Sequence, residues 1–188
     1  MKISGIKAVL AIVLAIGVWG CSSPGSSLPP IQPTKPGAYT LDSGDNLRII
    51  VFGEERLTGE YVVDGNGAIS IPLLETITAQ GKTTDQLEQA IIDELKKGIV
   101  VNPSVNVQIQ AFRPFYILGE VEKPGQYPYV EGMTTLTAVA IGGGFTFRAK
   151  QDIFSITRAQ GGKSIEGRGG RNTAVEPGDV VFVFERYF

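Results

Sequence analysis

The chain has 188 residues, of which 43% are hydrophobic and 19% are charged, and it contains no His and one Cys. Its 17 Lys and Arg residues against 19 Asp and Glu residues give a formal net charge of −2. Without His the chain cannot build a Ser-His-Asp or Cys-His catalytic site, and one Cys can form neither an internal disulfide nor a Cys-rich zinc site. The near-neutral charge argues against a dedicated nucleic-acid-binding protein. We therefore expect no enzymatic activity, no bound metal and no cofactor.

Residues 1–20 are typical of a secretory signal peptide. Two lysines precede an apolar run over residues 8–19, which is too short to span a bilayer comfortably as a mature helix. The run ends beside the single cysteine, Cys21, and this arrangement resembles a bacterial lipobox. It predicts that Cys21 is lipidated and becomes the first residue of a mature lipoprotein. An ordinary signal peptide with an incidental Cys, or an uncleaved anchor, is the alternative.

Residues 21–37 are rich in Ser, Pro and Gly and contain few large apolar side chains. Such a composition cannot bury a core and predicts a semi-extended tether. We expect folded structure to begin near Tyr39.

Four strand-like segments and a helix follow in the next part of the chain. Residues 47–52 are β-branched and apolar, which predicts a strand. The segments on either side of Gly65-Asn66-Gly67 predict a β-hairpin that is closed by Pro72. Residues 83–97 predict a helix, with apolar residues recurring every four positions, and residues 105–110 alternate as in a half-buried strand.

The helix has clear start and stop signals. Thr83 and Gln86 form a capping box, and Leu87, Ile91 and Leu95 form the apolar stripe. Gly98 is placed where a C-terminal helix cap favours glycine.

A second unit repeats this mixture of short strands with one helix. We expect strands over residues 115–121, 127–130, 153–158 and 180–184, and a helix over 135–141. Residues 142–144 are three glycines that follow the helix, and no Lys-Ser pair comes after them, which favours a helix stop over a phosphate-binding loop. Both units therefore predict the α+β class.

A weak internal repeat has an offset of 66 residues. It pairs Gly53, Glu54, Gly59 and Tyr61 with Gly119, Glu120, Gly125 and Tyr127. Two related hairpins would explain it, and so would turn glycines shared by chance.

Residues 148–171 hold six basic residues against two acidic ones, in a chain that is otherwise acidic. They are candidates for a patch that contacts an anionic glycan, lipid headgroups or a neighbouring subunit: Arg148, Lys150, Arg158, Lys163, Arg168 and Arg171. A solvated polar hairpin is the alternative, and residues 168–171 are expected in a mobile loop. Residues 42–46 could bind a cation, but they lack the spacing of a calcium loop and favour an Asx turn.

The longest ordered motifs resemble the polysaccharide biosynthesis/export family of outer-membrane lipoproteins. Residues 39–49 are similar to its opening Y-x-L-x-x-G-D-x-L-x-I, and residues 63–72 to its V-D-x-x-G-x-I-x-x-P pattern. Residues 117–121, 123–125, 136–144 and 177–181 resemble a soluble-ligand-binding β-grasp (SLBB) domain. The residues that carry these motifs are Gly44, Asp45, Asp64, Gly67, Pro72, Gly119, Pro124, Gly125, Gly143, Gly178 and Asp179.

The resemblance implies a polysaccharide export domain over residues 38–112 and one SLBB domain over residues 113–188. It implies a lipid-anchored protein on the periplasmic face of the outer membrane, assembled as a ring of identical subunits that exports capsular polysaccharide or exopolysaccharide. It further implies docking to an inner-membrane polysaccharide copolymerase, which is often coupled to a tyrosine autokinase. A periplasmic lipoprotein that binds a small soluble ligand without export is the alternative function.

Long members of this family continue into a C-terminal helix that crosses the outer membrane. A spanning helix needs about 20 residues, and the sequence ends soon after its last predicted strand. The expectation at this stage is a periplasmic subunit that passes glycan to a separate outer-membrane channel.

The lipobox generates the first prediction. The Cys21→Ser substitution removes the thiol that lipidation requires, so the variant should lack the lipid mass and leave the membrane fraction. Mass spectrometry and fractionation of cells check this outcome. Continued membrane association of an unlipidated variant would contradict it.

Overall fold

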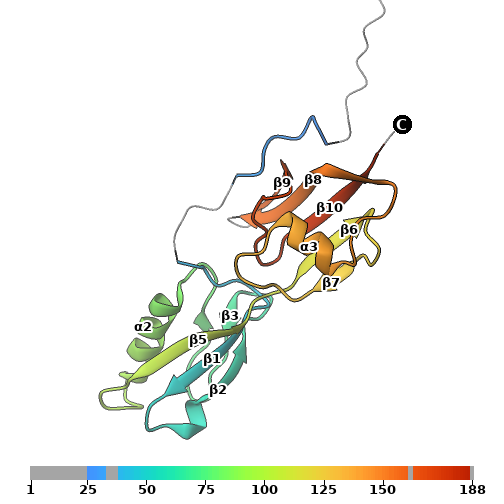
Figure 1. Ribbon diagram of the computed structural model, residues 1–188. Helices are drawn as coiled ribbons and strands as arrows, with labels where there is room; N and C mark the ends of the chain where they lie inside the picture. The colour runs from blue at the N-terminus through green and yellow to red at the C-terminus, as the bar shows by residue number, and fades with distance from the viewer. Residues whose placement is uncertain (1–24, 33–37, 161–162, 187–188) are drawn as a thin grey trace, which may run out of the picture.

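The computed structural model describes residues 25–32, 38–160 and 163–186, and it contains two domains that lie end to end (Figure 1). Each domain has its own hydrophobic core and one α-helix against a β-sheet, which confirms the α+β class. The predicted lipidation site, Cys21, lies outside the described residues.

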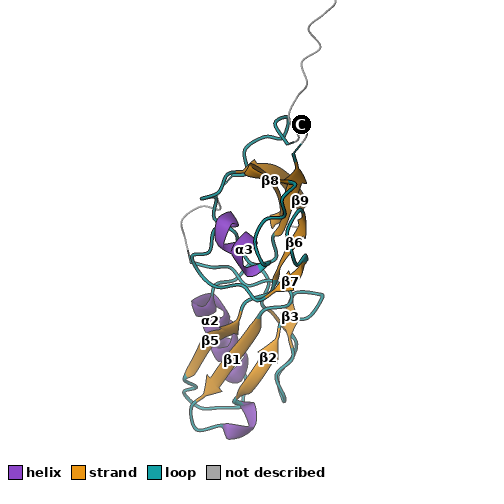
Figure 2. Ribbon diagram, turned by 45° about the vertical axis from the view of Figure 1, so that its right-hand side comes forward, coloured by secondary structure: helices purple, strands orange, loops and turns teal. Residues whose placement is uncertain are grey.

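The first domain is a three-stranded antiparallel sheet in the order β2-β1-β5, covered on one face by α2 (Figure 2). A short two-stranded sheet, β3-β4, completes it. Its elements are β1 (Asn46–Val51), the 3-10 helix η1 (Glu55–Leu57), β2 (Gly59–Val62), β3 (Ala68–Ile69), β4 (Ile77–Thr78), α2 (Thr84–Leu95) and β5 (Val105–Ala111).

Helix α2 matches its sequence prediction closely. Thr83 caps it, and the reciprocal hydrogen bonds with Gln86 complete the predicted capping box. Leu87, Ile91 and Leu95 are fully buried against the sheet. Local sequence was sufficient here because capping and a four-residue apolar period both act within the helix itself.

The predicted hairpin around residues 65–67 is wrong. A tight turn is present, since the Asp64 side chain accepts hydrogen bonds from the backbone N–H groups of Asn66 (2.8 Å) and Ala68 (2.9 Å). The flanking strands, however, belong to different sheets, because β2 pairs with β1 and β3 pairs with β4. Pro72 lies in the exposed connection between β3 and its antiparallel partner β4, and it does not close the predicted hairpin.

The second domain is a five-stranded sheet in the order β7-β6-β10-β8-β9, with α3 on one face (Figure 1). Strands β6 and β10 are parallel, and the other pairs are antiparallel. Its elements are β6 (Phe115–Gly119), β7 (Gly125–Tyr127), α3 (Thr135–Ile141), β8 (Ala149–Gln160), β9 (Lys163–Gly169) and β10 (Val180–Glu185).

The three glycines after α3 end the helix, as the sequence predicted. The N–H of Gly142 donates to the Ala138 carbonyl, and the N–H of Gly144 donates to the Val139 carbonyl. Gly143 and Gly144 both adopt positive φ, a conformation that favours glycine.

Each of the two hairpins of the weak repeat has a tyrosine whose hydroxyl donates to the carbonyl four residues before it. The Tyr61 hydroxyl donates to the Leu57 carbonyl at 2.9 Å, and the Tyr127 hydroxyl donates to the Lys123 carbonyl at 2.8 Å. The likeness is confined to the hairpins, because β1 has only antiparallel neighbours whereas β6 lies parallel to β10. Pro124 lies in the turn of the second hairpin, and Gly125 is the first residue of β7.

Residues 25–32 pack on the second domain, so folded structure begins before the expected position near Tyr39. The Arg168 N–H donates to the Pro29 carbonyl at 2.7 Å, and the Ile31 N–H donates to the Arg168 carbonyl at 2.9 Å. Pro30 thereby pairs in parallel with Arg168 on β9, the edge strand of the sheet. Arg168 and Gly169 belong to β9 and not to a loop, contrary to expectation.

Two glycines at corresponding positions of the weak repeat provide a test of the fold. Gly53 and Gly119 have φ values of +82° and +85°, but a Cβ would meet nothing within 4 Å at Gly53 and would overlap the Val183 carbonyl at Gly119. We expect Gly53→Ala to lose about 1–2 kcal/mol of stability from backbone strain. Gly119→Ala should lose on the order of 2–5 kcal/mol, because β10 must also move.

Hydrogen exchange read by mass spectrometry separates the two domains and checks this difference. The Gly119 variant should expose the amides of β6 and β10, while the Gly53 variant serves as the matched control. Equal losses of stability in the two variants would show that the overlap of the new Cβ with the Val183 carbonyl is relieved at no cost.

Candidate functional site

The Gly44-Asp45 motif forms a turn at the start of β1, in which Gly44 is exposed and Asp45 is buried. The N–H of Asp42 donates to the Asp45 carboxylate at 2.8 Å, and the N–H of Asp45 donates to the Asp42 carbonyl at 3.2 Å. Gly44 takes the positive φ of the turn, +93°. Asp45 is completely buried, and the groups around its carboxylate are hydrogen-bond donors. The geometry therefore supports the turn interpretation of residues 42–46 over the cation site.

The Gly178-Asp179 motif repeats this turn at the start of β10. The N–H of Glu176 donates to the Asp179 carboxylate at 2.8 Å, and the N–H of Asp179 donates to the Glu176 carbonyl at 3.1 Å. Gly178 has a φ of +83°, and Asp179 is completely buried. One local device, an acidic residue three positions before a buried Asp, thus starts a central strand in each domain.

Arg158 neutralises the second of these buried carboxylates. Its Nε and Nη2 donate to the two Asp179 oxygens at 2.9 and 2.7 Å, and Nη1 pairs with Glu176. Burial lowers the pKa of Arg158, but the hydrogen bonds and negative charges of Asp179 and Glu176 outweigh it, so the pKa lies above its usual value. Arg158 is only 4% exposed. Its position is structural, and it cannot belong to an exposed contact patch.

Arg113 plays the corresponding part for the first carboxylate and lies between the domains. Its backbone N–H donates to Asp45 at 3.0 Å, and its guanidinium donates to the Tyr39 hydroxyl at 3.0 Å and lies 3.4 Å from Asp42. Burial, and next the charge of Asp45, raises the pKa of Tyr39, which keeps its hydroxyl protonated as a donor. A Cβ at Gly178 would come within 2.6 Å of Arg113 Nε.

An aromatic chain continues this junction. Tyr39 packs edge-on against Phe112 at a centroid distance of 5.0 Å, and Phe112 packs edge-on against Tyr129 at 5.4 Å. Tyr39 and Phe112 flank the first sheet, whereas Tyr129 borders the second core. The junction therefore combines buried charge with apolar packing. Nothing in the sequence indicated the role of Arg113, because the partners of one isolated Arg cannot be recognised from its charge.

The remaining motif residues lie outside this junction, in turns and connections or, for Gly119 and Gly125, at the ends of strands. Gly67 has a φ of +75°, and its carbonyl accepts hydrogen bonds from the N–H groups of Ala79 and Gln80. A Cβ at Gly143 would lie 3.1 Å from the Cβ of Glu122, so the backbone passes close to that side chain. These positions shape the backbone and bring no group of reactive side chains together.

The candidate basic residues are distributed along the β8-β9 edge rather than gathered in one patch. Lys163 and Arg168 lie opposite Gln160 and Ser155, at the two ends of β9, and five residues of a strand span about 17 Å. Arg148 pairs with Glu185 at the start of β8, beside Lys150. Arg171 follows β9 and is exposed. Only the exposed members of the set are available for contact with a glycan or a subunit.

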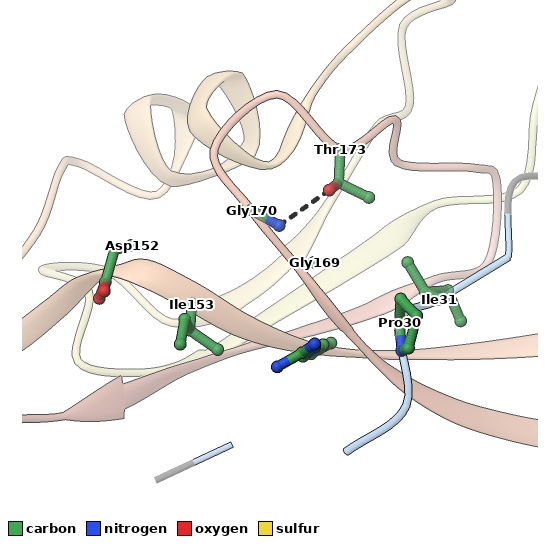
Figure 3. A pocket seen from close by; sticks show the side chains of 8 residues that line it. Pro30, Ile31, Asp152, Ile153, Gly169, Gly170 and Thr173 are labelled. Carbon is green, nitrogen blue, oxygen red and sulfur yellow. Dashed lines mark hydrogen bonds between the residues drawn. The ribbon is translucent and has the colours of Figure 1, made fainter. Parts of the chain in front are cut away.

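A shallow groove of about 360 Å³ lies where residues 30–31 meet the β8-β9 edge (Figure 3). Its polar side chains are Asp152, Arg168 and Thr173, and the Thr173 hydroxyl accepts a hydrogen bond from the Gly170 N–H at 2.8 Å. Leu28 and Ile31, the apolar residues in the Pro-rich segment, were the sequence signal that could have indicated this docking. Among the described side chains, no group of three His, Cys, Asp or Glu residues is placed to hold a metal ion.

Comparison with known families matches the two domains separately. Residues 33–110 match the family described as polysaccharide biosynthesis/export protein, and residues 114–168 match the SLBB domain. Residues 33–110 are thus a polysaccharide biosynthesis/export domain, and an SLBB domain follows it. The first domain is hereafter the export domain and the second the SLBB domain, and both expectations of family and fold class are confirmed.

Two named relatives match part of this chain. The exopolysaccharide production protein ExoF of Rhizobium meliloti is 39% identical over 118 residues, which cover 56% of this chain and 28% of that protein. The polysialic acid transport protein KpsD of Escherichia coli is 26% identical over 108 residues, which cover 56% of this chain and 19% of that protein. The match thus spans less than a third of either relative. Within residues 25–32, 38–160 and 163–186, no helix is long and apolar enough to cross a membrane.

The different environments of two arginines generate a prediction. Arg158→Met leaves Asp179 buried without its partner, and breaking a buried pair in this way should cost about 3–5 kcal/mol. Arg168→Met, on the neighbouring strand, removes an exposed side chain and should cost less than about 0.5 kcal/mol. Urea unfolding measures both. A stable Arg158 variant would show that the Asp179 turn does not depend on this ion pair.

Proposed function

We propose that this protein is a lipid-anchored periplasmic subunit that acts in the export of capsular polysaccharide or exopolysaccharide. The observation that carries the proposal is the family match over both domains, together with relatives named for exopolysaccharide production and polysialic acid transport. The lipobox-like sequence before Cys21 supports the anchor and its location at the outer membrane.

The part played by the protein in export is structural and not catalytic. The two completely buried carboxylates, Asp45 and Asp179, are held by arginines and backbone donors, so neither is available as a general acid or base. The junction network around Arg113 supports a fixed arrangement of the two domains, which suits a subunit of a larger conduit.

Charge supports assembly as a ring of identical subunits. Residues 38–112 contain eleven acidic against five basic residues, whereas the SLBB domain carries the exposed basic residues Lys163, Arg168 and Arg171 along one edge. An acidic export domain and a basic edge on the next copy attract each other, and a head-to-tail contact of this kind forms a ring when the rotation between copies closes. The same exposed cations are candidates for contact with an anionic glycan.

The proposed partners follow from the family. They are other copies of this chain, an inner-membrane polysaccharide copolymerase or tyrosine autokinase, an outer-membrane channel, and the polysaccharide itself. The anchor and the SLBB domain would keep the protein on the periplasmic face of the outer membrane.

A second candidate function is capture of a small soluble ligand without export. The groove beside Arg168 favours it, because a carboxylate, a guanidinium and a hydroxyl line this shallow depression. Capture predicts a defect in uptake of a small molecule, with surface polysaccharide unchanged.

Deletion of the gene tests the main proposal. We expect polysaccharide to disappear from the cell surface and medium and to accumulate inside the cell, because its synthesis continues while its exit is blocked. Chemical quantification of the polysaccharide in the two fractions measures this, and a wild-type copy of the gene should restore export.

Normal surface polysaccharide in the deletion strain would reject the export proposal. Loss of polysaccharide in both fractions would indicate a role in synthesis and would also count against it.

A further inference from the structure

The first described residue of the N-terminal segment lies at the end of the SLBB domain that is remote from the export domain (Figure 1). A Cβ at Gly25 would be 2.5 Å from Phe184 on β10 and 3.2 Å from Ile153 on β8. Phe184 is next to the last residue of β10, and the start of β8 lies beside it. Cys21 is four residues before Gly25, so the chain between them spans at most about 14 Å.

This end of the SLBB domain carries an exposed aromatic residue among basic ones. The second-domain tip, as we define it, consists of Phe147, Arg148, Lys150 and Arg186. The Ala149 N–H closes a turn on the Thr146 carbonyl at 3.1 Å, and the Arg186 N–H donates to the Arg148 carbonyl at 2.8 Å. Phe147 stands at the corner of this turn and is 81% exposed.

Two acidic residues near the second-domain tip are engaged by neighbouring side chains. Glu185 pairs with Arg148, and the Glu120 carboxylate accepts a hydrogen bond from the Thr146 hydroxyl at 2.5 Å. The Arg148 side chain remains 50% exposed in spite of its ion pair. The tip as defined therefore carries one exposed apolar ring and three basic side chains.

We propose that the second-domain tip rests on the lipid headgroups of the membrane that holds the anchor, with Phe147 in the interfacial layer. The proposal relies on lipidation of Cys21, which places the bilayer within reach of this end. Aromatic side chains favour the membrane interface. Each basic residue close to an anionic surface strengthens binding by roughly fivefold.

The opposite end of the molecule offers the matched control. Phe52 and Val101 are 61% and 89% exposed at the far end of the export domain, where the Phe52 N–H donates to the Ser104 carbonyl. This first-domain tip is as apolar as the second-domain tip, and strand β1 separates it from the domain junction. The two tips lie at opposite ends of the molecule, and the anchor is close to the second-domain tip. Exposed apolar area alone therefore does not decide which tip meets lipid.

Site-specific fluorescence tests the proposal on the full-length lipoprotein. Phe147→Cys and Val101→Cys each add one thiol, which is labelled with an environment-sensitive dye. The labelled proteins are reconstituted in vesicles of phosphatidylethanolamine and phosphatidylglycerol, with or without lipid carrying a nitroxide on its headgroup. We expect quenching and a blue shift for the dye at position 147 and neither for the dye at position 101. Replacing phosphatidylglycerol with phosphatidylcholine should weaken the quenching.

Quenching at position 101, or at neither position, overturns the proposal. The parent protein distinguishes this failure from failure of the anchor, because Cys21 is its single Cys and takes up no dye when it is lipidated. Labelling of the parent protein would show that Cys21 is not lipidated and would reject the lipoprotein part of the proposed function. Unlipidated protein added to the same vesicles would then test the tip directly, with quenching at position 147 supporting it and no quenching rejecting it.

Discussion

The Asp45 carboxylate is buried where the two domains meet, and it holds hydrogen bonds from both sides of that junction. Tyr39 and Asp42 donate from the export domain, and Arg113 donates from the segment that leads into the SLBB domain. An unpaired carboxylate in this position would cost several kcal/mol, so any movement that separates Arg113 from Asp45 is opposed strongly. Aromatic packing of Phe112 between Tyr39 and Tyr129 restricts the same movement. The relative position of the two domains depends on this junction.

The same turn appears again in front of β10, although the surrounding sheets differ. Asp179 takes its guanidinium from Arg158 on the neighbouring strand β8, whereas Asp45 takes its guanidinium from the chain that joins the domains. Gly178 also leaves the space that Arg113 occupies, so the second turn contributes to the first one's ion pair. A repeated local motif thus supports strand initiation in both domains and domain orientation in one place.

Features that depend on neighbouring residues were predictable from the sequence, and features that depend on distant residues were not. The capping box and apolar stripe of α2 act over a few positions, and the glycines after α3 act on their own backbone. The partner of β2 is decided by β1 and not by the turn that follows β2, which is why the predicted hairpin failed.

Two functional expectations failed for a related reason. Arg158 looked like one member of a basic run because its buried partner, Asp179, lies 21 positions further along the chain. Residues 29–31 looked like a tether because the strand that binds them, β9, is more than a hundred residues away. Family motifs were more informative than either pattern, since they reflect the folded arrangement as a whole.

The parallel pairing of Pro30 with Arg168 also determines how the protein carries mechanical load. A pull applied to the chain before Gly25 reaches the SLBB sheet through the packing of Gly25 against Phe184 and Ile153 and through the hydrogen bonds at Pro29 and Ile31. The contact between Gln32 and Arg158 adds a further attachment to β8. Tension from this end is therefore distributed over β8, β9 and β10 before it reaches the chain that leads into the export domain.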